Sequence, residues 1–246
     1  MRRLLPDLLR AGWGVPPQHL RGRPLCRSNR SDGTVPEWKK GCTMLTTLNL
    51  TGLEDAFDRY LSYWHTDPAT YDALDIAISP IALELAYRNY LLWHEEDKAR
   101  RTDVDDSAIA VVKRAIDKLN QQRNDLIEKL DEAILAEVTA VAPKEAADRI
   151  NSETPGSIVD RISIMSLKIY HMDEDSRRAD IDDDHRQRSL HRLSVLKLQR
   201  YDLYVALEQL LADYVTGHKR MKLYKQFKMY NDPTLNPELY RTRSQG

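Results

Sequence analysis

Glycine is rare over most of this 246-residue chain, and that scarcity constrains the fold more than any other feature of the sequence. Between Met44 and the terminal Gly246 only three glycines occur, at positions 52, 156 and 217. When chain-breaking residues are this sparse, long helices are the natural outcome. No strand-like alternation is sustained, and no repeat of solenoid length is visible. The sequence therefore predicts an all-α fold.

Apolar residues recur at helical spacing in five stretches. They predict helices over about 53–65, from Pro80 to about 101, from about 106 to before Pro143, from Pro155 to about 172, and over a last stretch that Gly217 closes. Asp105 or Asp106 is expected to cap the third of these helices, and Thr154 the fourth.

The segment 158–172 is apolar on nearly every side, which is typical of a helix at the centre of its domain. The charged run 173–184 that follows predicts a solvated connection or a frayed polar stretch. We expect an antiparallel bundle of four to five long helices with an apolar central helix.

The first 43 residues differ in composition from the rest. They hold nine Lys and Arg against three Asp and Glu, together with both cysteines and five of the nine glycines. This pattern predicts either a poorly ordered leader that resembles an organelle-targeting segment or an upstream extension, with Met44 as the true start. Residues 44–246 are then expected to form a single helical bundle domain with a loose C-terminal tail.

Overall charge and cysteine usage limit the partners. The formal net charge is −1, which does not indicate a nucleic-acid partner. No window approaches eighteen consecutive apolar residues, so no membrane span is predicted. The absence of cysteine after residue 43 fits a reducing compartment, and we expect a cytoplasmic location.

Polar residues interrupt the apolar stripes of the predicted helices. Burying an unpaired charge costs several kcal/mol, so each such group needs a partner, contact with water or a ligand. The candidate ligand-binding residues selected in this way are Asn89, Glu96, Asn120, Arg123, Asp160, Lys168 and Arg200.

These residues allow two interpretations. In the structural one, Glu96 pairs with Arg123 and Asp160 pairs with Arg200, which fixes the register of the helices. In the functional one, Arg123, Lys168 and Arg200 converge on a cleft and bind an anion, because the planar guanidinium group suits phosphate or carboxylate. If the protein is an enzyme, the candidates for proton transfer are Glu96, Asp160 and His171.

A second basic patch lies near the C-terminus, where basic and aromatic residues alternate. Its candidate binding residues are Lys222, Tyr224, Lys225 and Lys228, which would suit a phosphate, a nucleotide or an acidic surface. The alternative is an amphipathic last helix that packs Tyr224, Phe227 and Met229 inward.

The sequence predicts neither a metal site nor a cofactor. The Glu-x-x-His pairs of helical di-metal proteins are missing, and His171 with Glu174 has the reverse order. Neither a glycine-rich phosphate loop nor a Gly-x-Ser-x-Gly elbow occurs.

Five strings in the sequence resemble the bacterial family of unknown function numbered 4254. They are NYLLWHEEDKAR (89–100), IDKLNQQRND (116–125), ETPGSIVDR (153–161), LKIYHM (167–172) and YKQFKMYNDP (224–233). The likeness covers roughly residues 53–240 and implies a helical fold. Members of that family are often encoded beside glycosyltransferases of cell-envelope synthesis, which implies a sugar phosphate, a nucleotide sugar or a glycosyltransferase as the partner.

Three functions remain open from the sequence. The first is an accessory protein of envelope polysaccharide synthesis that binds an anionic sugar ligand or a partner enzyme. The second is an enzyme acting on a phosphorylated or carboxylated small molecule, and the third is a purely structural interaction module. The residues do not decide whether the chain forms a homo-oligomer.

Overall fold

The computed structural model describes residues 48–227 and 234–238 of the chain. Within these ranges the regular structure is entirely helical: α3 (Leu53–Trp64), α4 (Pro80–Lys98), α5 (Asp106–Val141), α6 (Pro155–Arg177) and α7 (Asp183–Val215). The predicted all-α fold is confirmed. Residues 1–43, predicted as a leader or an upstream extension, lie outside the described part.

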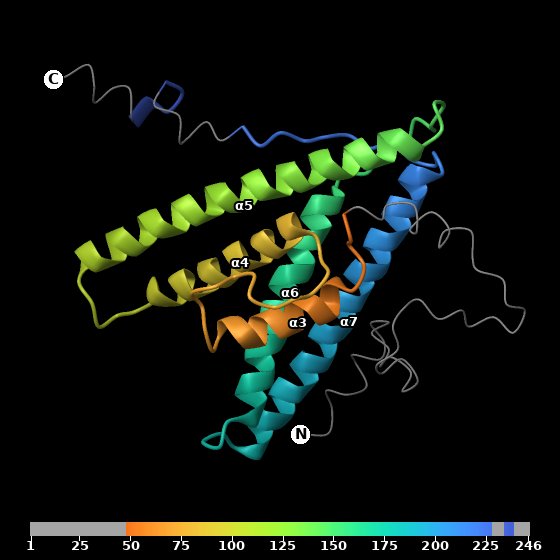
Figure 1. Cartoon of the computed structure of the whole chain (residues 1–246). Helices are drawn as coiled ribbons and strands as arrows, with labels where there is room; N and C mark the ends of the chain where they lie inside the picture. Colours follow the sequence, from red (N-terminus) through yellow and green to blue (C-terminus); the bar gives the residue numbers. More distant parts are fainter. Residues whose placement is uncertain (1–47, 228–233, 239–246) are drawn as a thin grey trace, which may run out of the picture.

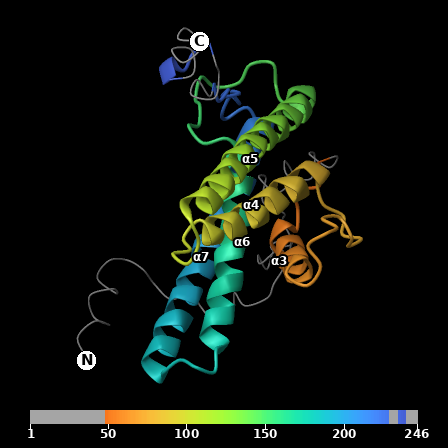
Figure 2. The same cartoon turned by 90° about the vertical axis from the view of Figure 1, so that its left-hand side faces the viewer.

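The helices form two antiparallel hairpins that cross each other. Helices α4 and α5 make one hairpin and α6 and α7 make the other, while α3 lies across α6 (Figure 1). The view turned by 90° shows the same crossing from the side (Figure 2). Helix α6 contacts all four other helices, which confirms the bundle with an apolar central helix.

Four of the five helices begin at a side chain that accepts a hydrogen bond from the backbone N–H three residues later. Such a cap stabilises a helix by about 1 kcal/mol. The capping residues are Ser79, Asp105, Thr154 and Asp182. The caps expected at Asp105 and Thr154 are therefore confirmed. Gly217, with a φ of 75°, follows α7 and ends it as predicted.

Helix α6 lies very close to α5 at Gly156. A Cβ atom at this position would lie 2.7 Å from the carbonyl oxygen of Ile127, so only glycine fits without a shift. The backbone N–H of Gly156 donates a 2.7 Å hydrogen bond to the carboxylate of Asp131, which is buried. Burial raises the pKa of Asp131, and this N–H at the start of α6 partly offsets that effect. The first turn of α6 is thus fixed against the middle of α5.

The charged run 173–184 is mostly helical, contrary to the predicted connection. Helix α6 continues to Arg177 and α7 begins at Asp183, so the turn between them is short. The carboxylate of Asp175 accepts hydrogen bonds from Ser189 and His185 of α7. These hydrogen bonds between α6 and α7 stabilise the end of the hairpin without apolar contacts. A search for apolar spacing in the sequence therefore does not detect this part of the helices.

The chain after Gly217 is not the amphipathic helix considered from the sequence. Residues 221–227 have no helical structure, and Met221 is buried whereas Tyr224 and Phe227 are exposed. Lys225 pairs with Glu128 and Glu132 of α5. Charge therefore holds the segment against α5 at Lys225, while Met221 packs in the hydrophobic core. Met229 lies outside the described residues.

Among the described helices, none combines the length and the apolar character needed to cross a membrane.

Candidate functional site

The structure confirms that three of the predicted interior polar residues are buried. Asn89 and Arg200 are 4% exposed and Asp160 is 3% exposed. Lys168 is exposed, so its predicted position inside the bundle is wrong. Helix α6 is apolar on so many sides that its pattern does not distinguish the few positions that face solvent.

Asp160 is the centre of a buried hydrogen-bond network, which we call the Asp160 network. Arg123 of α5 donates from Nε to Oδ1 at 2.7 Å and from Nη2 to Oδ2 at 2.5 Å. The amide of Asn89 on α4 donates to Oδ1 at 2.8 Å and to the hydroxyl of Ser163 at 2.7 Å. Both carboxylate oxygens are satisfied, and the forked contact raises the pKa of Arg123.

Arg200 belongs to a different network on the other side of α6. It donates to both carboxylate oxygens of Asp58, to Glu54 at 2.8 Å and to the hydroxyl of Ser166 at 2.9 Å. Glu54 and Asp58 lie one turn apart on α3. Their i, i+4 spacing on an otherwise amphipathic helix is the signal that could have identified them as partners of a cation.

Both predicted ion pairs are therefore wrong. Asp160 pairs with Arg123 instead of Arg200, and Glu96 pairs at 3.0 Å with Arg100, in the turn that follows α4. The predicted convergence of Arg123, Lys168 and Arg200 is also wrong, because these groups have separate surroundings. The angle at which the two hairpins cross determines which helix faces are in contact. The apolar pattern of a single helix does not predict this crossing angle.

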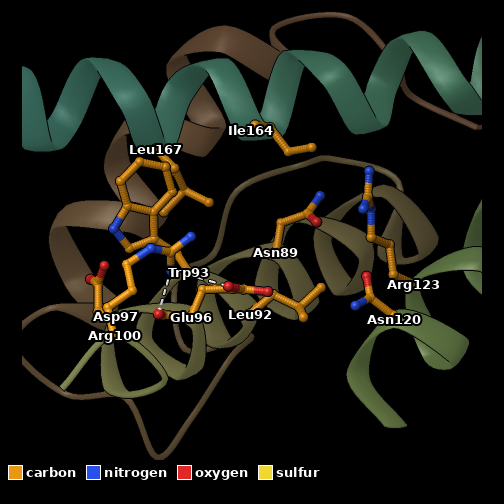
Figure 3. A pocket seen from close by; sticks show the side chains of 10 residues that line it. All are labelled: Asn89, Leu92, Trp93, Glu96, Asp97, Arg100, Asn120, Arg123, Ile164 and Leu167. Atoms are coloured by element: carbon orange, nitrogen blue, oxygen red, sulfur yellow. Dashed lines mark hydrogen bonds and ion pairs between the residues drawn. The ribbon is translucent and has the colours of Figure 1, made fainter. Parts of the chain in front are cut away.

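A cleft of about 380 Å³ opens between α4, α5 and α6, and we call it the Trp93 cleft (Figure 3). Its polar lining is Asn89, Glu96, Asp97, Arg100, Asn120 and Arg123, and its apolar lining is Leu92, Trp93, Ile164 and Leu167. Arg123 and Asn120 lie at one end and Arg100 with Asp97 and Trp93 at the other (Figure 3).

Four of the seven predicted ligand-binding residues line this cleft: Asn89, Glu96, Asn120 and Arg123. The lining carries two guanidinium groups and two carboxylates. Sequence reasoning missed Arg100, because it lies in the exposed turn after α4 and interrupts no apolar stripe. It also missed Trp93, whose indole lines the cleft and stacks on His171 at a centroid distance of 4.9 Å.

The three candidates for proton transfer have different positions. Glu96 lines the cleft. Asp160 accepts three hydrogen bonds and is buried behind Arg123 and Asn89. His171 is absent from the lining and lies beneath Trp93.

His171 belongs to a histidine cluster with His65 and His94. One ring nitrogen from each lies within 4.8 Å of the other two. The sequence patterns for metal ligands did not find this cluster, because its members come from three helices and form no short motif. A weak signal exists in the sequence, since His94 and His171 both neighbour aromatic residues in the helices predicted to pack together.

The second basic patch is only partly described. Lys225 pairs with carboxylates of α5, while Lys222 and Tyr224 are exposed. Lys228 lies outside the described residues.

A family model described as "Protein of unknown function (DUF4254)" matches residues 80–223, more than half of the chain. The match covers helices α4 to α7 and every residue that lines the Trp93 cleft. No curated protein and no solved structure matches the chain.

Proposed function

We propose, for a chain that belongs to the DUF4254 family of proteins of unknown function, that the Trp93 cleft binds a small sugar ligand carrying an anionic group, such as a sugar phosphate or a nucleotide sugar. The observation that carries this proposal is the composition of the lining: one flat indole, two amides, two carboxylates and two guanidinium groups around about 380 Å³. This volume is within the range of small-molecule sites.

The lining suits the sugar part of such a ligand. Hydroxyl groups both donate and accept hydrogen bonds, and Glu96 and Asp97 accept while Asn120 can do either. The indole of Trp93 offers an apolar surface for the carbon-bound face of a sugar ring.

The anionic part is assigned to Arg100 instead of the predicted Arg200 and Lys168. Arg100 is paired with Glu96, but its side chain is 68% exposed and that of Glu96 40%. An exposed pair of this kind contributes at most about 1 kcal/mol, so a phosphate can replace the carboxylate as partner. Arg123 at the other end keeps Nη1 outside its fork with Asp160 and can add a second donor.

The proposed role is that of an accessory protein of cell-envelope polysaccharide synthesis in the cytoplasm, which presents or senses the ligand for a glycosyltransferase. The cysteine-free body supports a reducing compartment. Of the three predicted proton-transfer residues, the enzyme alternative retains Glu96, because Asp160 is fully hydrogen-bonded and His171 is outside the lining.

Thermal-shift screening against nucleotide sugars, hexose phosphates and the matching free sugars and nucleotides tests the proposal. A ligand that raises Tm should lose more than ~10-fold in affinity in Arg100→Gln, which removes one charge-assisted hydrogen bond of about 1.5–3 kcal/mol. Arg101→Gln is the matched control, because Arg101 is the adjacent residue, pairs with Asp103 and does not line the cleft.

Two results would contradict the proposal. One is a panel without any ligand that raises Tm, and the other is a ligand whose affinity falls equally in Arg100→Gln and Arg101→Gln. Turnover of a bound ligand that disappears in Glu96→Gln, with Tm unchanged, would support the enzyme alternative instead.

A further inference from the structure

The histidine cluster brings three imidazole rings together from three helices. His65 follows the last residue of α3, His94 is on α4 and His171 is on α6. All three rings are half-buried, and one nitrogen of each lies within 4.8 Å of the other two. In the part of the chain that the structure describes, the Nε2 atom of each ring is buried and makes no hydrogen bond.

For His65 and His171, a hydrogen bond on the opposite ring nitrogen defines which tautomer is present. Nδ1 of His65 is 2.7 Å from the carbonyl oxygen of Leu61, and a carbonyl only accepts, so Nδ1 carries the hydrogen. Nδ1 of His171 is 2.9 Å from the carboxylate of Glu174, which also accepts. In the neutral rings of His65 and His171 the lone pair is therefore on Nε2. A carbonyl or carboxylate on Nδ1 is the usual partner of a histidine that binds metal through its other nitrogen.

Aromatic packing alone does not account for the cluster. His65 stacks on Tyr170 with centroids 4.0 Å apart, and His171 stacks on Trp93. A phenylalanine would give the same stacking without a buried nitrogen. An unsatisfied buried acceptor costs about 1–3 kcal/mol, and His65 and His171 each place one here.

Burial lowers the pKa of His65 and His94, and the other rings of the cluster lower it further. An imidazole ring binds a metal ion through the lone pair of its neutral form.

We propose that His65, His94 and His171 form a binding site for one divalent transition-metal ion, such as Zn²⁺, coordinated through their Nε2 atoms. Three nitrogen ligands favour Zn²⁺, Co²⁺, Ni²⁺ or Cu²⁺ over Mg²⁺ and Ca²⁺, which prefer oxygen. Three protein ligands also leave a fourth position for water or another ligand, as in catalytic zinc sites.

The geometry requires a small closure of the rings on the ion. Zn–N distances of 2.0–2.1 Å in a tetrahedral site place the nitrogens about 3.3 Å apart, so no pair must approach by more than about 1.5 Å. Rotation of the side chains supplies this movement. The C-terminal end of α3, where His65 lies, also favours a positive charge.

A bound ion would join α3 to α4 and α6. Helix α3 precedes residues 80–223, the part that the family model matches, and has few contacts with α4. The proposed metal site therefore goes beyond the ligand cleft, and neither proposal depends on the other.

The test uses the full chain without a histidine tag, stripped with a chelator. Elemental analysis after dialysis against Zn²⁺ should give one ion per chain, and Co²⁺ should give the visible absorption of a tetrahedral site. His94→Phe and His171→Phe keep a ring and remove the nitrogen. Each should weaken Zn²⁺ binding by more than ~100-fold, the upper limit for the loss of a partner that only orients a ligand. His191→Phe, which changes an exposed histidine of α7, should bind as the unaltered protein does.

X-ray absorption of the unaltered Zn²⁺ protein provides a measurement that does not depend on how the variants fold. It should show three imidazole ligands. The proposal is overturned by the absence of saturable 1:1 binding, by fewer than three imidazoles, or by binding that survives both phenylalanine variants.

Discussion

The Asp160 network and the histidine cluster are both groups of polar side chains inside the bundle, but they differ in how well their hydrogen bonds are satisfied. In the Asp160 network, Arg123 and Asn89 satisfy both carboxylate oxygens. In the histidine cluster, three ring nitrogens lie close together without a partner among the described residues. A buried polar group thus indicates a ligand only when its own protein leaves it unsatisfied.

The largest effect that tests this difference is expected for Asp160→Ala. It leaves the guanidinium of Arg123 and the amide of Asn89 without their acceptor, and breaking a buried pair in this way costs about 3–5 kcal/mol. Because the side chain of Arg123 is 27% exposed, we expect the lower end, about 3 kcal/mol, in urea unfolding. Asp97→Ala, an exposed carboxylate of the cleft, should change the stability by less than about 0.5 kcal/mol. A loss below 1 kcal/mol for Asp160→Ala would mean that the network is not structural.

Arg200→Gln should have a smaller effect, about 1–2 kcal/mol. Its partners Glu54 and Asp58 are 35% and 46% exposed, so water can solvate them after the guanidinium is removed. Urea unfolding measures the change, and Arg192→Gln, an exposed arginine of α7, is the control. If Arg200→Gln and Asp160→Ala lower the free energy of unfolding equally, the exposure of the carboxylate in each ion pair does not determine how much stability is lost.

His171→Phe should leave the metal-free protein at least as stable as the unaltered chain, because it removes an unsatisfied nitrogen and keeps the stacking on Trp93. Saturating Zn²⁺ should reverse the order by raising the Tm of the unaltered chain alone. Thermal unfolding in chelator and in Zn²⁺ measures both states. If His171→Phe has a lower Tm than the unaltered chain in chelator, then His171 stabilises the metal-free protein, as Asp160 does, and the proposed difference between the two groups is wrong.

The smallest effect is expected at the exposed tip of the α6–α7 hairpin. Hydrogen bonds from Ser189 and His185 lower the pKa of Asp175 from 3.8 to about 2. Since this pKa is lower in the folded state, the carboxylate stabilises the protein above about pH 4, and the contribution disappears as the pH falls towards 2. The Tm difference between the unaltered chain and Asp175→Asn should therefore shrink between pH 5 and pH 2. A difference that stays constant would contradict the assignment.

The sequence predicted what depends on local pattern. The helices, the caps at Asp105 and Thr154, the turn at Gly217 and the central position of α6 all follow from spacing and residue type. The burial of Asn89, Asp160 and Arg200 was also predictable, because each interrupts an apolar stripe.

What the sequence did not predict depends on how helices cross. The partners of Asp160 and Arg200 come from faces that only the crossing angle of the hairpins brings together. The histidine cluster has the same origin, since His94 and His171 lie on two different helices and His65 directly follows a third. Of the two alternatives for the segment after Gly217, the amphipathic helix is wrong: residues 221–227 are not helical, and Lys225 pairs with α5.

The close approach of α6 to α5 at Gly156 has a consequence for how such a protein can vary. On α5, Arg123, Ile127 and Asp131 lie one turn apart, and on α6 Gly156 lies one turn before Asp160. The contact of Gly156 with Ile127 and Asp131 therefore sets the distance between the helices at the neighbouring Arg123–Asp160 pair. A methyl group at position 156 would push the two helices apart without touching any residue of the cleft. Descendants of this chain could therefore widen the space for a ligand through one remote mutation, at the expense of the Arg123–Asp160 fork.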